Sequence, residues 1–200
     1  MFVQVIEGHV ADREELKASI DHWHNELAPG SVGWLGSTCG VTADGMFVML
    51  ARFESAEAAR RNSDRPEQHQ WWMETAKLFA GDVTFHDSPD VLTFLEGGSD
   101  RAGFVQVIQG RSRDPERLGR MFDEATMAQL RQARPEVIGG LVARYGDGEF
   151  TQAVYFTQEA AAREGERQEE FQQRYAEDMA PLMSDLRYHD LKQPWLYSPR

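Results

Sequence analysis

The hydrophobic pattern of the first part of the chain predicts a strand, a helix and then two strands. Residues 2–7 are rich in Val, Ile and Phe, which is typical of a strand. Asp12 then precedes apolar residues spaced by three and four positions, which predicts an amphipathic helix that ends at Pro29. Residues 32–41 and 46–53 predict a β-hairpin because Asp-Gly lies between them.

A second helical segment and further strands follow. The helix begins near Ser55, breaks before Pro66, which suits the first turn of a renewed helix, and runs to about residue 80. Residues 82–87 predict a fourth strand, and a short extra strand spans 91–95. The order βαββαβ is that of the ferredoxin-like unit, an α+β arrangement with two helices on one face of an antiparallel sheet.

The chain is an internal duplication. Residues 2–6, Phe-Val-Gln-Val-Ile, recur letter for letter as residues 104–108, and about a dozen further identities follow in order. The segment 96–103 is rich in linker residues. We therefore predict two tandem ferredoxin-like units, residues 1–98 and 99–200.

Two strands of the first unit are apolar on both faces. In residues 2–6 and 46–53 apolar side chains occupy odd and even positions alike, which indicates burial on both sides of the sheet. Helices cover one face only. We therefore expect the two sheets to pack face to face as a pseudo-two-fold α+β barrel, closed within a monomer or extended to a homodimer.

Composition and charge limit the classes of partner that the protein is expected to bind. The chain has 33 acidic and 21 basic side chains, a net charge of −12 and a hydrophobic share of 41%. Nucleic acids and anionic membranes need a basic patch, so neither is expected as a partner. There is no apolar run long enough for a membrane span and no signal-like start, and the single Cys39 excludes an internal disulfide. A cytoplasmic location is expected.

The repeated βαββαβ pattern, with the helix pair from Ser55 to Phe79 and the short extra strand, resembles the dimeric α+β barrel superfamily. Within it, the chain is most similar to antibiotic-biosynthesis-monooxygenase-like domains. The resemblance implies a pocket between helices and sheet. It also implies activities such as cofactor-free oxygenation of phenolic polycyclic compounds, haem degradation or muconolactone isomerisation.

Haem degradation does not fit the residues. The haem-degrading members use an Asn on the first strand and a Trp with a haem-ligating His on the second helix. This chain has Gln4 or Glu7 on the strand, and His69 lies about one turn out of place. We therefore expect no cofactor, and no His, Cys or Asp spacing predicts a metal site.

Aromatic side chains and charge are divided unequally. Residues 1–100 hold four of five Trp and five of six His and carry 17 acidic against 7 basic side chains, while residues 101–200 carry 16 against 14. One hypothesis is that the first half keeps a ligand pocket and the second packs against it; the other is that Trp fills a wider core. Under the first hypothesis, the ligand-binding residues are Trp23, Trp34, Trp72 and His69.

Four residues are candidates for catalysis. His24 borders the buried helix face and could act as a base, and His86 recurs as His189, which also suits a shared structural hydrogen bond. Asn62 or Arg52 could steady developing negative charge, although the segment around Asn62 also fits an ordinary turn and Arg52 a surface ion pair.

Two functions remain open from the sequence. One is a cofactor-free monooxygenase or isomerase that acts on an aromatic or polyketide-like small molecule. The other is a non-catalytic binding or structural protein with the same barrel.

Overall fold

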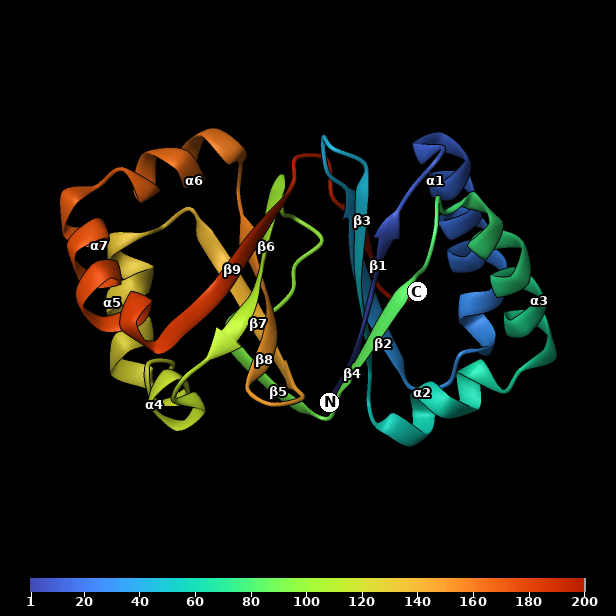
Figure 1. The fold of residues 1–200 in the computed structure, drawn as a ribbon, viewed down its shortest axis with the longest axis horizontal. Coiled ribbons are helices and arrows are strands. Elements are labelled where there is room, and N and C mark those ends of the chain that lie inside the picture. The colour runs from blue at the N-terminus through green and yellow to red at the C-terminus, as the bar shows by residue number, and fades with distance from the viewer. Residues whose placement is uncertain (200) are drawn as a thin grey trace. The chain divides into compact units, whose positions relative to one another are not determined.

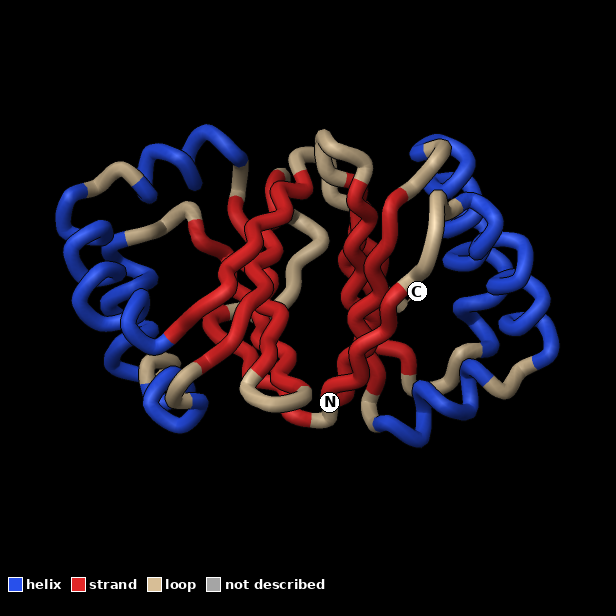
Figure 2. Tube along the Cα trace, viewed as in Figure 1, coloured by secondary structure: helices blue, strands red, loops and turns tan. Residues whose placement is uncertain are grey.

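The chain folds into two five-stranded antiparallel sheets, each with helices on one face (Figures 1 and 2). The structure is a computed structural model and describes residues 1–199. Unit 1 comprises Met1–Asp90 together with the segment from Trp195, and unit 2 comprises Val91–Pro194. The predicted α+β class with two βαββαβ repeats is confirmed, while the packing of one sheet against the other stays a prediction. The boundary at residue 98 stays a prediction about the sequence repeat.

Unit 1 has the strand order β10-β2-β3-β1-β4. Its strands are β1 (Phe2–His9), β2 (Trp34–Val41), β3 (Met46–Phe53), β4 (Thr84–Ser88) and β10 (Trp195–Tyr197). Its helices are α1 (Arg13–His22), α2 (Ala56–Ser63) and α3 (Pro66–Thr75), with short helical turns η1 (Trp23–Leu27), η2 (Ala28–Gly30) and η3 (Ala76–Leu78).

Unit 2 repeats this plan with the strand order β5-β7-β8-β6-β9. Its strands are β5 (Asp90–Leu95), β6 (Phe104–Ser112), β7 (Val137–Tyr145), β8 (Glu149–Phe156) and β9 (Met183–Leu191). Its helices are α4 (Pro115–Arg120), α5 (Glu124–Ala133), α6 (Glu159–Glu166) and α7 (Glu169–Arg174), with turns η4 (Tyr175–Met179) and η5 (Ala180–Leu182).

The helices begin where their capping residues predict. The Asp12 carboxylate accepts hydrogen bonds from the backbone N–H groups of Glu14 and Glu15, both at 2.9 Å. Ser55 Oγ accepts from the N–H of Ala58 at 3.1 Å. Pro66 occupies the first turn of α3.

The first helical segments of the two units differ. In unit 1, α1 continues into the π-helical turn η1, where the N–H of Ala28 reaches the carbonyl of Trp23. In unit 2 helix α4 ends at Arg120, and Asp123 caps a new helix by accepting a hydrogen bond from the N–H of Thr126 at 2.7 Å. The sequence predicts the same single helix in both, so this break is a correction.

Each sheet takes its outer strand from the other repeat in sequence. β5 follows the first repeat but pairs beside β7, and β10 follows the second repeat but pairs beside β2. The exchange explains Gly140 in β7, because a Cβ there would lie 2.2 Å from the ring of Phe94 in β5. Unit 1 therefore combines residues from both ends of the sequence, whereas unit 2 is the continuous segment Val91–Pro194.

In each unit, one arginine links two segments of the helical layer by donating to a backbone carbonyl. In unit 1, Arg65 at the start of α3 donates from both Nη atoms to the carbonyl of Leu27, at 3.0 and 3.1 Å. In unit 2, Arg134 at the end of α5 donates to the carbonyl of Ala162 in α6 at 3.4 Å. Gly165 leaves room for Arg134, since a Cβ there would lie 2.2 Å from its Nε.

No helix within residues 1–199 combines the length and the apolar character that a membrane crossing needs.

Candidate functional site

A cavity of about 240 Å³ lies in unit 2, between the sheet and the helices. Its floor comes from β6, β7 and β8, and its walls come from α5 and from α7 with η4. Exposed residues such as Gln168, Glu170 and Arg174 belong to its lining, so the cavity opens to solvent beside α7.

The lining is mainly apolar. All four methionines of unit 2 and four phenylalanines contribute to it: Met121, Met127, Met179, Met183, Phe94, Phe122, Phe156 and Phe171. Methionine is flexible and polarisable and adapts to aromatic surfaces. An apolar chamber with few polar groups is the usual form of a small-molecule site.

Two glutamines bring polarity to the floor. Gln106 on β6 and Gln152 on β8 both line the cavity. Gln106 is only 8% exposed, and its Nε2 donates to Asp190 Oδ1 at 3.2 Å. This bond fixes the amide of Gln106, whose oxygen remains an acceptor for a ligand.

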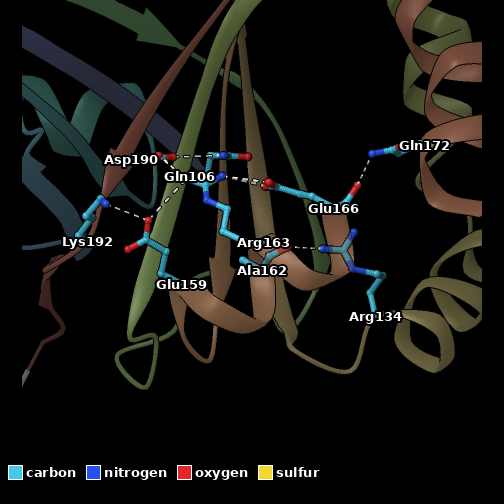
Figure 3. Close-up of polar contacts among 9 residues, drawn as sticks. All are labelled: Gln106, Arg134, Glu159, Ala162, Arg163, Glu166, Gln172, Asp190 and Lys192. Carbon is cyan, nitrogen blue, oxygen red and sulfur yellow. Dashed lines mark hydrogen bonds and ion pairs between the residues drawn. The ribbon is translucent and has the colours of Figure 1, made fainter. Parts of the chain in front are cut away.

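Arg163 organises the charges beside this floor, on the helical side of the sheet (Figure 3). It forms an ion pair with Asp190, and its Nη1 donates to both Glu166 oxygens at 3.0 and 3.1 Å. Burial opposes its charge, but the carboxylates of Glu166 and Asp190 outweigh burial and hold the pKa of Arg163 above its ordinary value. The permanent cation therefore orients Asp190, which in turn orients Gln106.

Glu159 and Gln172 complete this network. Glu159 joins it through Lys192 Nζ at 3.1 Å and Arg163 at 3.8 Å, and Gln172 donates to the backbone carbonyl of Glu166 at 3.2 Å (Figure 3). The network thus holds α6 against β9 and α7 against α6.

Arg134 forms a cationic wall of the cavity. Its side chain is 4% exposed and pairs with Glu136, and its guanidinium lies 4.5 Å from the ring centroid of Phe171. A cation over an aromatic face is stabilising when both are shielded from water. The stacked guanidinium therefore fixes Phe171 in the lining.

A pair of tyrosines stands at the edge of the cavity. The hydroxyls of Tyr175 and Tyr188 are 3.1 Å apart, and both residues line the cavity. Partial burial, together with the hydrogen bond between the Tyr188 and Tyr175 hydroxyls, raises the pKa of Tyr188. Tyr188 therefore stays a neutral phenol, able to donate a hydrogen bond to a ligand oxygen.

Unit 1 fills the space that is open in unit 2. Trp34 pairs with Phe53 at the position where Val137 pairs with Phe156, so Trp34 and Val137 are structural equivalents. Val137 lines the cavity, whereas the Trp34 indole is 5% exposed and packs edge-on against Trp23 with ring centroids 5.1 Å apart. An indole therefore occupies a place where unit 2 has only an isopropyl group.

The other predicted pocket aromatics also belong to this packed core. Trp23 Nε1 donates to Gln68 Oε1 at 2.5 Å, and Trp34 Nε1 donates to Ser37 Oγ at 3.1 Å. Trp72 packs against the same core and lies 5.2 Å from Phe85 between ring centroids. These contacts match the alternative that Trp fills a wider core; a ligand role for Trp23, Trp34 and Trp72 stays a prediction.

His69 and Asn62 differ in their exposure to solvent. His69 is exposed on α3. Asn62 is 6% exposed, and its Oδ1 accepts from Arg65 at 2.9 Å, which makes it part of the arginine contact described above. The catalytic role of Asn62 stays a prediction.

The predicted catalytic residues are not brought together. His24 lies on the helical side, 4.9 Å from Tyr197 between ring centroids. Arg52 pairs with Val3, and His86 pairs with Val5, so both side chains lie on the sheet face opposite to Phe2 and Ile6, which pack against the helices. His24 and Asn62 therefore cannot share a site with His86 and Arg52 in this unit.

His86 and His189 have equivalent polar neighbours. His86 Nε2 lies 3.8 Å from Glu7, and His189 Nε2 lies 3.0 Å from Gln109 Oε1. Glu7 and Gln109 occupy matching positions on β1 and β6. A shared structural contact at this position is what the repetition of the histidine predicts.

No cluster of three or more His, Cys, Asp or Glu suited to a metal ion occurs among residues 1–199. Cys39 is fully buried, and burial raises the pKa of its thiol.

The sequence favours a pocket in the first repeat because four of the five tryptophans and five of the six histidines lie there, whereas the described lining of the cavity in unit 2 contains neither residue type. The useful signal is a loss of bulk at matched positions, as in the replacement of Trp34 by Val137, together with the methionines of the second repeat.

No family model matches the chain, and no curated protein matches it in sequence. Solved structures do match. A candidate monooxygenase from Lactobacillus acidophilus is 14% identical with a TM-score of 0.73, and the alignment covers 98% of this chain and 95% of that one. A candidate monooxygenase from Fusobacterium nucleatum is 9% identical with a TM-score of 0.76 and coverages of 98% and 94%.

An anthrone oxidase-like protein is 10% identical, with a TM-score of 0.65 and coverages of 98% and 92%. At such identities the likeness shows the fold. The expected resemblance is thus confirmed as a likeness of fold to structures named as monooxygenases, over nearly the whole chain.

Proposed function

We propose that unit 2 binds a compact aromatic molecule in its cavity and oxidises it with molecular oxygen without a cofactor. The observation that carries the proposal is the apolar cavity of about 240 Å³ with the fixed amide of Gln106 on its floor. Its volume is slightly below the roughly 300–1,000 Å³ of pockets for drug-sized ligands, which favours two or three fused rings over a long chain. The folds of the structural neighbours named as monooxygenases support the reaction class.

The polar groups of the lining suit an oxygen-bearing ring system. Gln106 and the neutral Tyr188 would hydrogen-bond to a carbonyl or phenolic oxygen of the substrate. Glu166 is the carboxylate that Arg163 fixes beside the cavity, and we assign it to accept a proton from an activated ring carbon. The resulting carbanion would react with O₂, so that a CH₂ group and O₂ give a carbonyl group and water.

A second function, binding of an aromatic molecule without conversion, is favoured by the composition of the cavity lining. The cavity lining described here contains no histidine, and Glu166 already accepts two hydrogen bonds from Arg163. A carrier that binds an aromatic molecule without converting it would need nothing more than this lining.

Binding and oxygen consumption distinguish the two functions. Anthrone, a three-ring aromatic ketone suggested by the anthrone oxidase-like neighbour, is titrated calorimetrically and then assayed in an oxygen electrode. Val137→Trp should abolish both signals because an indole fills the cavity, as Trp34 does in unit 1. Val32→Trp adds the same side chain at a position that is 74% exposed and should change neither.

The outcomes are distinct. Oxygen uptake that Val137→Trp and Glu166→Gln both remove supports the oxidase. Binding that Val137→Trp removes, without oxygen uptake by the unmodified protein, supports the carrier. Binding that survives Val137→Trp would contradict the cavity as the site.

A further inference from the structure

We propose that the ligand of unit 2 carries an anionic group, such as a carboxylate, which binds a cluster of arginines at the mouth of the cavity. This inference rests on the proposed function and specifies its substrate class. The mouth is a second hollow lined by Arg117, Arg120, Arg174, Asp178, Met121 and Thr126.

The mouth and the cavity are continuous. Met121, Thr126, Arg174 and Asp178 line both hollows. Met121 belongs to the apolar lining already described, while Arg174 is exposed at the end of α7. A single molecule can therefore place its rings among the methionines and its polar end among the arginines.

The mouth is rich in positive charge although the protein as a whole is acidic. The protein carries a net charge of −12, yet three guanidinium groups meet one carboxylate, Asp178, in this lining. Within residues 1–199, no carboxylate lies in ion-pair range of Arg117 or Arg174, and Arg120 has only a 4.0 Å contact with the exposed Glu116. Arginines not engaged by protein carboxylates can bind those of a ligand.

The residue type favours a planar anion. A guanidinium presents a rigid fork of N–H donors that matches the two oxygens of a carboxylate, and it does so better than lysine. The structurally equivalent position of Arg174 in the first repeat is Trp71, whose indole donates to the carbonyl of Ser19 and packs on the core. The cationic mouth is thus a feature of the unit that has the cavity.

Matched ligands test the inference. The dissociation constants of 2-naphthoate and of the neutral 2-naphthamide are measured for the unmodified protein, Arg174→Gln and Arg131→Gln. Arg131 is exposed on α5 and lines neither hollow, so its variant makes the same change in net charge elsewhere. We expect naphthoate to bind roughly three- to tenfold more tightly than naphthamide, an advantage that Arg174→Gln reduces and Arg131→Gln retains.

Salt gives an independent readout. Because exposed charges are screened, raising NaCl from about 50 to 300 mM should weaken naphthoate binding and leave naphthamide binding unchanged. Equal affinities for the two probes, or an advantage that Arg174→Gln does not alter, would overturn the anionic ligand while the cavity stands. Failure of both probes to bind would overturn the proposed function as well.

Discussion

The two units share one topology but differ in what lies between sheet and helices. Unit 1 fills this space with Trp23 and Trp34, and unit 2 leaves a cavity beside Val137. All five tryptophans belong to unit 1, because Trp195 joins its sheet through β10. A duplicated fold can therefore assign packing to one copy and a chamber to the other without a change in strand order.

The difference also reverses a common expectation about aromatic residues. A concentration of Trp and His suggests a ligand pocket, but buried indoles whose N–H groups have protein partners are filled space rather than open space. The cavity of unit 2 is lined by flexible methionines and by phenylalanines, with no indole among the lining residues that the structure describes. The copy that holds no tryptophan is the better candidate for binding.

The largest effect is expected from removing β10. A chain that ends at Pro194 loses Trp195 and Tyr197, which are 6% and 9% exposed, and should destabilise unit 1 by more than about 3 kcal/mol, since a buried Trp→Ala change alone costs about 3–5 kcal/mol. Cys39, whose Sγ lies 3.7 Å from the carbonyl of Trp195, should become reactive to a thiol reagent. A chain that ends at Tyr197 is the control; equal thiol protection in both chains would contradict the strand exchange.

The next largest effect on stability is expected from replacing Arg134, which lies in the wall of the cavity in unit 2. Arg134→Ala should cost about 3 kcal/mol of unfolding free energy, because it leaves the largely shielded Glu136 without a cation and frees Phe171. Chemical denaturation measures this loss. Arg131→Ala, on the exposed side of the same helix, should change stability by less than about 0.5 kcal/mol. A cost for Arg134→Ala as small as that of the control would show that the ion pair does not hold the wall.

A similar or smaller loss of stability is expected when a cavity is created in the packed core of unit 1. Trp34→Val creates in unit 1 the side chain that unit 2 has naturally and should cost about 2–4 kcal/mol through the new cavity. It should not alter ligand binding in unit 2. The unfolding midpoint and the affinity for anthrone are measured together; a lost affinity with unchanged stability would return the binding site to unit 1.

The smallest effect is a dependence on pH. Burial raises the pKa of Asp21, but hydrogen bonds from Lys17 and Tyr197 outweigh it and hold that pKa below its ordinary value. The resulting stability is present above about pH 4 and is lost as pH falls through the lowered pKa.

Tyr197→Phe removes one of these hydrogen bonds and should reduce the stability lost between pH 6 and pH 3. The difference should stay below about 1 kcal/mol, because the Asp21 side chain is 42% exposed and screened by solvent. Tyr188→Phe, in unit 2, is the matched control. Equal acid sensitivity of the two variants would contradict the role of the Tyr197–Asp21 contact.

The sequence predicts the elements and their order well because caps and periodicity act locally. Asp12, Ser55 and Pro66 begin helices as their types predict, and the repeat reveals the second unit. It does not reveal the exchange of β5 and β10, since a strand of three to six residues pairs with either sheet on local grounds. Nor does Asp123 disclose that it caps a new helix, because its counterpart Asp21 lies within α1.

The site was harder to predict for a related reason. Whether Trp34 lines a pocket or fills one depends on the neighbours that the fold brings to it, here Trp23 and Ser37. A cavity is a property of missing volume, and no single residue type marks it. Comparison of the two repeats at equal register, Trp34 against Val137, is what exposes it.

Methionine methyl resonances test the central claim most directly, because the eight methionines divide evenly between the units. The protein is labelled with methyl-¹³C methionine and titrated with the neutral 2-naphthamide. The account predicts shifts at the four cavity residues, Met121, Met127, Met179 and Met183, with Met46, Met49 and Met73 unmoved. Shifts confined to Met46, Met49 and Met73 would place the ligand in unit 1 and contradict it.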